Sequence, residues 1–178
     1  MAWGETVASP APVAQPTPAI KAEARERFDR GVRLFEKGEN ASALAEFKRV
    51  NEIIPTPLVL YNMGDARLAL SKYEEAIQCY THAAEADPAK RHEALNRIGE
   101  AFVRQGKSDK AITYFRQAIE INPRFVTARL NLCRLLAGQK RYAEACQQFD
   151  EALKIAPQNT PAHEALEAAR RAMQSQGY

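Results

Sequence analysis

LNRIGEAF, residues 95–102, is followed by AITYF at residues 111–115 and then by a proline at position 123. The same order of small, aromatic and proline residues recurs in three other places along the chain. The prolines that end the four copies lie 33, 35 and 34 residues apart: Pro55, Pro88, Pro123 and Pro157. Such regular spacing predicts an array of structural repeats.

Further columns keep register with these prolines. Eight residues before each proline stands an aromatic residue, twelve before stands alanine, and twenty-four before stands a small residue. These are Phe47, Tyr80, Phe115 and Phe149; Ala43, Ala76, Ala111 and Ala145; and Gly31, Gly64, Gly99 and Cys133. We expect pairs of antiparallel helices in which the alanines face the small residues. The aromatic side chain should fill the space toward the next unit.

Strong helix formers dominate from about residue 22 onward. Pro55, Pro88, Pro123 and Pro157 fall between the expected helices, because proline restrains the residue before it to extended conformations. The expected helices span residues 22–37, 41–54, 57–70, 74–86, 91–104, 108–121, 125–138 and 142–155. Thr160-Pro161 is typical of a helix start, so a last helix should run to about Met173. Residues 1–21 hold four prolines and predict an extended or disordered arm.

The pattern resembles that of the tetratricopeptide repeat family: Leu95, Ile98, Gly99 and Phe102, then Ala111 and Phe115, then Pro123. The resemblance covers about residues 24–159. It implies an all-α, right-handed superhelical solenoid of antiparallel helix pairs, with repeats at about 24–56, 57–91, 92–125 and 126–159. A capping helix and tail would then occupy residues 160–178. Four positions depart from the family pattern, since arginine replaces a large apolar or aromatic residue at Arg27, Arg30, Arg67 and Arg129.

Bulk composition favours no nucleic-acid or membrane function. The net charge is +3 and basic residues alternate with acidic ones, so no basic block stands out. No apolar stretch approaches the length of a membrane span. The chain has three cysteines and no Cys-x-x-Cys pair, which predicts neither a disulfide framework nor a zinc site. Unpaired cysteines favour the cytoplasm, whereas the Ala/Pro-rich arm favours a bacterial periplasmic or envelope protein whose signal peptide has been removed, and both remain open.

The search for catalytic motifs predicts neither an enzyme nor a cofactor. Gly106-Lys107-Ser108 resembles the end of a phosphate-binding loop, but Ala101 stands where that motif needs glycine. His92-Glu93 begins like a zinc-protease motif, but Asn96 occupies the place of the second histidine. No metal site is therefore expected.

The family resemblance implies that the first helix of each repeat lines a concave groove. By register, the partner-binding residues would be Phe28, Val32, Phe35, Leu58, Tyr61, Asn62, Asp65, Leu68, Asn96, Arg97, Arg104, Asn131 and Arg134. The N-terminal half of this set is apolar and aromatic, and the C-terminal half is polar and rich in arginine. Of the residue set with which some family members grip a chaperone's C-terminal carboxylate, only Asn62 and Arg97 are present. An apolar or mixed peptide therefore suits the groove better.

The leading hypothesis is a scaffold or adaptor that binds a peptide or helix of another protein in this groove. Two alternatives stay open. In the first, the arm, with Val13 and Ile20, docks into the groove of the same or a neighbouring molecule and forms a homo-oligomer. In the second, the chain is the non-catalytic repeat domain of a larger enzyme or envelope complex.

Overall fold

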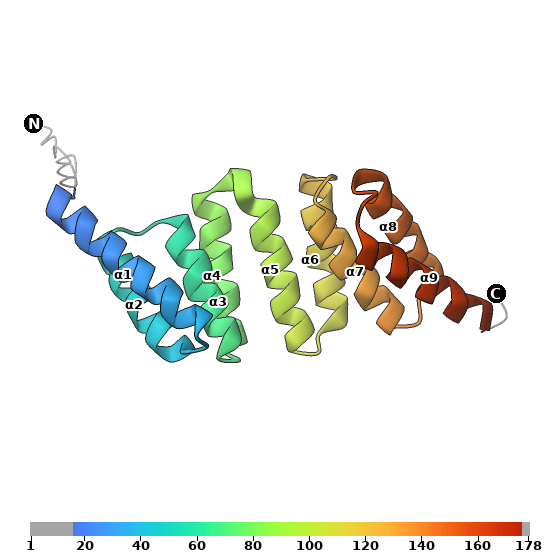
Figure 1. Ribbon diagram of the computed structural model, residues 1–178, viewed down its shortest axis with the longest axis horizontal. Helices are drawn as coiled ribbons and strands as arrows, with labels where there is room; N and C mark the ends of the chain where they lie inside the picture. The colour runs from blue at the N-terminus through green and yellow to red at the C-terminus, as the bar shows by residue number, and fades with distance from the viewer. Residues whose placement is uncertain (1–15, 176–178) are drawn as a thin grey trace, which may run out of the picture.

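The computed structural model describes residues 16–175, which form an elongated row of helices with the two ends far apart (Figure 1). Nine α-helices and one 3-10 turn make up the described part, which holds no strand. Their bounds are α1 (Pro18–Glu36), α2 (Asn40–Ile53), α3 (Pro57–Ala69), α4 (Tyr73–Ala86), η1 (Pro88–Lys90), α5 (Arg91–Arg104), α6 (Ser108–Ile121), α7 (Val126–Gly138), α8 (Tyr142–Ile155) and α9 (Thr160–Ser175). The predicted all-α solenoid is confirmed.

Each helix packs against the helices before and after it in the chain. Further contacts join α1 to α3, α5 to α7 and α7 to α9, which are all odd-numbered helices. Within residues 16–175, no pair of even-numbered helices makes comparable contacts. The row therefore curves, with the first helices of the repeats (α1, α3, α5 and α7, the A helices) on its inner face and the second helices (α2, α4, α6 and α8, the B helices) outside.

The aromatic column packs directly on the glycine column within each hairpin. A Cβ added at Gly31, Gly64 or Gly99 would lie 2.6, 2.5 or 2.6 Å from a ring atom of Phe47, Tyr80 or Phe115, respectively. These rings are fully buried. Each ring lies over the glycine of its own hairpin and also belongs to a core cluster that includes residues of the next A helix, as the prediction that it fills space toward the next repeat requires. Glycine is required because no side chain fits between the A-helix backbone and the ring.

Four helix ends share one turn geometry. The backbone is left-handed at Gly38, Ser71, Gly106 and Lys140. In the first turn, the Gly38 amide donates to the Phe35 carbonyl at 2.9 Å and the Glu39 amide to the Leu34 carbonyl at 2.9 Å. The same pair of bonds recurs in the other three turns and satisfies the last carbonyls of each A helix. The two helices of each repeat are thus joined by the same tight reversal.

The start of α1 differs from the prediction. The helix begins at Pro18, four residues before the expected boundary, and the Thr17 hydroxyl caps it by accepting from the Ile20 amide at 3.4 Å. The part of the predicted arm from Pro18 to Lys21 is therefore helical. Ile20, proposed as an arm residue, lies in α1 and is 40% exposed. Val13 and the rest of the predicted arm up to residue 15 lie outside the described residues, as does the tail from residue 176.

All four arginines that replace residues of the family pattern link the two helices of a hairpin, and Arg67 on α3 does so by donating to Glu75 on α4 at 3.2 Å. Glu46 on α2 accepts from Arg27 at 3.4 Å and from Arg30 at 3.3 Å. Arg129 on α7 donates to Gln148 on α8 at 3.1 Å. Each departure from the pattern thus exchanges an apolar contact for a polar one between the same two helices.

Replacing Gly99 by alanine should lower the free energy of unfolding by about 1–3 kcal/mol, because the Phe115 ring must move away from α5. Gly138→Ala is the matched control, since a Cβ at Gly138 meets nothing within 4 Å. The control should leave stability unchanged or raise it by up to about 1 kcal/mol. Urea unfolding followed by circular dichroism measures both, and equal effects of the two variants would contradict the packing described here.

Candidate partner-binding groove

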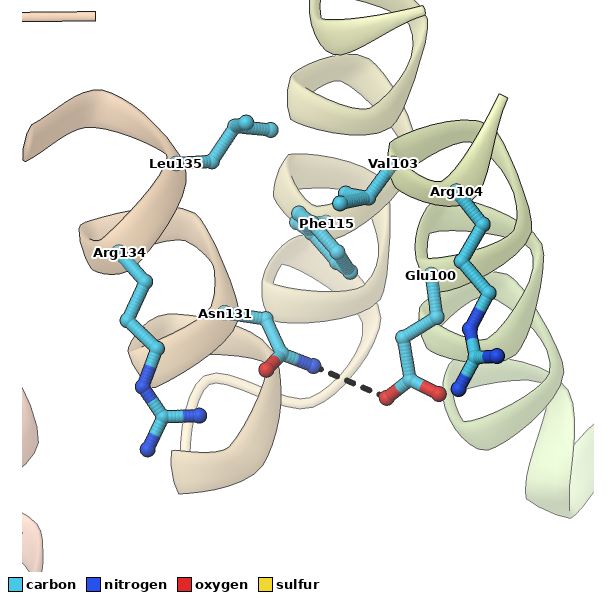
Figure 2. A pocket seen from close by; sticks show the side chains of 7 residues that line it. All are labelled: Glu100, Val103, Arg104, Phe115, Asn131, Arg134 and Leu135. Atoms are coloured by element: carbon cyan, nitrogen blue, oxygen red, sulfur yellow. Dashed lines mark hydrogen bonds between the residues drawn. The ribbon is translucent and has the colours of Figure 1, made fainter. Parts of the chain in front are cut away.

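Two pockets open on the inner face between successive A helices. The α3–α5 pocket has a volume of about 370 Å³ and is lined by Thr56, Pro57, Leu58, Tyr61, Asn62, Asp65, Asp87, Lys90, Glu93 and Arg97. The α5–α7 pocket has a volume of about 350 Å³ and is lined by Glu100, Val103, Arg104, Phe115, Asn131, Arg134 and Leu135 (Figure 2). They follow one another along the row of repeats.

Eight of the predicted groove residues lie in these pockets. The α3–α5 pocket brings together Leu58, Tyr61, Asn62, Asp65 and Arg97. The α5–α7 pocket brings together Arg104, Asn131 and Arg134. Residues far apart in the sequence thus share a surface because each holds an equivalent place in its repeat.

The other predicted residues serve the fold. Phe28, Val32 and Phe35 are half-buried against the core of the first two repeats, and the Phe28 ring centroid lies 5.7 Å from that of Phe47. Leu68 and Asn96 are only 6% and 4% exposed. Their side chains therefore lie beneath the groove, and their prediction as surface contacts needs correction.

A polar network begins beneath the α3–α5 pocket. The Tyr80 hydroxyl on α4 donates to Asp65 Oδ1 on α3 at 2.7 Å. The Arg97 guanidinium on α5 lies 3.8 Å from the same oxygen and donates to Glu100 Oε2 at 3.2 Å. One arginine therefore joins the acidic residues of two successive A helices.

The network continues into the fourth repeat through amide side chains. Glu100 Oε1 accepts from Asn96 Nδ2 at 2.8 Å and from Asn131 Nδ2 at 3.0 Å. Asn131 also donates to Asn96 Oδ1 at 3.0 Å. The floor of the groove is thus connected from α4 through α3 and α5 to α7 by hydrogen bonds and, between Asp65 and Arg97, by an ion pair.

Burial shapes the protonation of this network. Desolvation raises the pKa of Asp65, while Arg97 and the Tyr80 hydroxyl act in the opposite direction. Desolvation, reinforced by the charges of Glu93 and Asp87, also raises the pKa of Tyr61 to about 12. Tyr61 is therefore a neutral donor at physiological pH, and its hydroxyl donates to the Lys90 carbonyl at 3.0 Å.

Two arginines and two apolar side chains remain available at the surface. Arg104 and Arg134 are exposed, and within residues 16–175 neither forms an ion pair (Figure 2). Leu58 is 57% exposed and Val103 is 41% exposed. The groove therefore offers apolar contact and positive charge above a floor whose own polar groups are already paired.

Nothing in the described part of the chain assembles a metal centre, because no three His, Cys, Asp or Glu side chains gather there in a suitable arrangement. Burial raises the pKa of Cys133 to about 12, so this thiol is a poor nucleophile.

Within residues 16–175, none of the helices combines the length and apolar character that spanning a bilayer requires.

The model of the family "Tetratricopeptide repeat" matches residues 61–124 and 96–160, which together span more than half of the chain. The chain belongs to the tetratricopeptide repeat family. Members of this family are protein-interaction scaffolds, generally without catalytic activity, and the repeat architecture predicted from the sequence is confirmed.

Two curated relatives are each 30% identical to this tetratricopeptide repeat protein over 132 residues. Photosystem I assembly protein Ycf3 of Acaryochloris marina (strain MBIC 11017) matches over 62% of this chain and 80% of the relative. Protein STIP1 homolog of Dictyostelium discoideum matches over 74% of this chain. The chain spans 21% of that longer relative.

Solved structures show the same solenoid. The crystal structure of MamA protein has a TM-score of 0.69 and 19% identity, and the match covers 86% of this chain and 84% of MamA. The first tetratricopeptide domain of Spaghetti (RPAP3), bound to the HSP90 peptide SRMEEVD, has a TM-score of 0.60 and 25% identity. That match covers 67% of this chain and 94% of the domain.

The sequence-based set missed the apolar wall of the α5–α7 pocket, formed by Val103, Phe115 and Leu135. Val103 precedes Arg104 at the end of α5, so an apolar residue beside a predicted groove residue was an available signal. Phe115 gave no such signal, because its column marks it as a core residue.

Replacing Tyr80 by phenylalanine should lower the free energy of unfolding by about 1–2 kcal/mol at neutral pH, because Asp65 loses a buried donor. Phenylalanine stands at this position in the other three repeats, so the ring packing is retained. Tyr61→Phe is the control and should cost less, since its hydroxyl bond is exposed.

The deficit of Tyr80→Phe should depend on pH. Because the pKa of Asp65 is raised in the folded chain, the folded chain binds more protons than the unfolded chain over the pH range in which Asp65 titrates. The free energy of unfolding therefore falls as the pH rises through this titration range. Loss of the Tyr80 hydroxyl raises the pKa of Asp65 further. The loss in free energy of unfolding caused by Tyr80→Phe is therefore largest above the titration range of Asp65, where the carboxylate is charged, and smaller below it. Urea unfolding between about pH 4 and pH 7 measures this, and a pH-independent deficit would refute the assignment.

Proposed function

We propose that this tetratricopeptide repeat protein is a non-catalytic adaptor that binds a segment of a partner protein along its concave groove. The observation that carries the proposal is the alignment of two pockets on the A-helix face. Each exposes an apolar side chain, Leu58 in the α3–α5 pocket and Val103 in the α5–α7 pocket, beside arginine.

The exposed apolar groups supply a driving force for association. Burying apolar surface yields roughly 25 cal/mol per Å², and Leu58 and Val103 both leave much of their side chains in water. Arginine and aromatic residues dominate the energetics of protein interfaces, and the groove offers Tyr61, Arg104 and Arg134. A partner segment that covers both pockets would bury these groups together.

The paired floor lowers the cost of binding. Asp65, Arg97, Glu100 and Asn131 already hold one another in place, so the side chains of the floor need little ordering when a partner arrives. Such preorganisation favours recognition of an extended or helical peptide by a preformed surface.

The relatives support an adaptor role in general terms. The RPAP3 domain, at 25% identity, binds a peptide of another protein, and Ycf3 is an assembly protein. The ligand of the RPAP3 domain is not transferred to this chain, because only Asn62 and Arg97 match the carboxylate-gripping set that some family members use.

A photo-crosslinking amino acid tests the groove. Placed at Leu58 or Val103, it should capture a partner polypeptide in cells of the source organism, because these side chains face the proposed ligand. Placed at Gln78 or Glu120, which are exposed on the B helices α4 and α6, it should not capture the same polypeptide. Adducts are detected as mass shifts on gels and identified by mass spectrometry.

The comparison between faces decides the outcome. A polypeptide captured equally from all four positions, or only from the B-helix positions, would show that the concave groove is not the binding surface. Circular dichroism of each labelled protein verifies that the helices remain intact.

A further inference from the structure

The α5–α7 pocket has an apolar side and a cationic rim. Val103, Phe115 and Leu135 lie on one side of it, and Arg104 and Arg134 flank the other (Figure 2). At about 350 Å³ it lies at the small end of the range for ligand sites, roughly 300–1,000 Å³. The space suits a single side chain with its adjoining backbone.

The sign of the charge in this pocket depends on Glu100, its only acidic lining residue. Both oxygens of Glu100 are occupied, one by the Asn96 and Asn131 amides and the other by the Arg97 guanidinium. Arg97, which also pairs with Asp65, offsets part of this charge. The rim arginines have no such partner in the described part of the chain, so the pocket presents net positive charge.

The two arginines approach from different helices. Arg104 extends from α5 and Arg134 from α7, and the hydrogen-bonded pair of Glu100 and Asn131 lies between them (Figure 2). The guanidinium groups therefore flank the pocket on two sides and do not converge on one point. This arrangement matches two separate carboxylates and not a single chain terminus.

We infer that the α5–α7 pocket binds one apolar side chain from an internal stretch of the partner, with an acidic residue on each side of that apolar residue. The inference rests on the groove function proposed above and specifies the partner's chemistry. The apolar side chain packs on Val103 and Leu135, and the flanking carboxylates pair with Arg104 and Arg134.

A displayed library of random peptides, each followed by a constant carrier so that its C-terminus is blocked, tests the inference on the intact chain. Wild-type protein should enrich peptides in which acidic residues flank an apolar one. Arg104→Gln with Arg134→Gln should bind a synthetic, C-terminally amidated copy of the enriched peptide about tenfold more weakly, as expected for two partly exposed charge pairs.

The matched control is Arg91→Gln with Arg124→Gln. It removes the same charge from exposed positions that line neither groove pocket, so the peptide should bind as it does to wild type. Val103→Ser should weaken binding of the same peptide while preserving its dependence on ionic strength, because the arginines remain. Binding is measured by fluorescence anisotropy at several salt concentrations.

Four results would overturn the inference. Enriched peptides without acidic residues that still crosslink to position 58 or 103 would contradict the pocket's specificity and leave the groove function standing. Equal loss of binding in the two arginine double variants would show that only overall charge matters. Failure to enrich any blocked peptide, with binding restored by a free C-terminal carboxylate, would assign a terminal ligand, whereas no binding of either kind would remove the groove function as well.

Discussion

The contact between a glycine backbone and an aromatic ring determines how close the two helices of each hairpin lie. At Gly31, Gly64 and Gly99 the ring of the facing B helix occupies the space in which a Cβ would stand. Because this contact is repeated at almost constant sequence spacing, each hairpin meets the next in the same way. The curvature of the row, and with it the inner face, follows from this local packing.

The same register assigns the groove. The residue after the small position of each A helix is Val32, Asp65, Glu100 or Arg134, and the last three line the pockets. In each A helix, the small residue thus faces the core, and the residue directly after it faces the groove. The character of the inner face changes from apolar through acidic to basic along this column, so a ligand meets different chemistry at each repeat.

Features that depend on repeat spacing could be predicted from the sequence, and features that depend on individual contacts could not. The helix pairs followed from the spacing, and eight of the pocket residues followed from the groove that the family resemblance implies. The start of α1 was missed because Pro18 was counted with the proline-rich arm, although Thr17-Pro18 has the same capping signature as Thr160-Pro161. Register also places Leu68 and Asn96 on the A helices without revealing that neighbouring helices cover them.

The two pockets differ in how firmly their walls are joined. The helices α5 and α7 touch directly, and Asn131 ties α7 to both Asn96 and Glu100. The α3–α5 junction has sparser contacts between the helices and depends on polar links: the 3.8 Å pair of Asp65 with Arg97 and the bond from Tyr61 to the Lys90 carbonyl. Water can compete for these partly exposed links, so this junction is the more adaptable of the two. A pocket discriminates best between ligands when the helices that line it keep a fixed relative position. The α5–α7 pocket meets that condition.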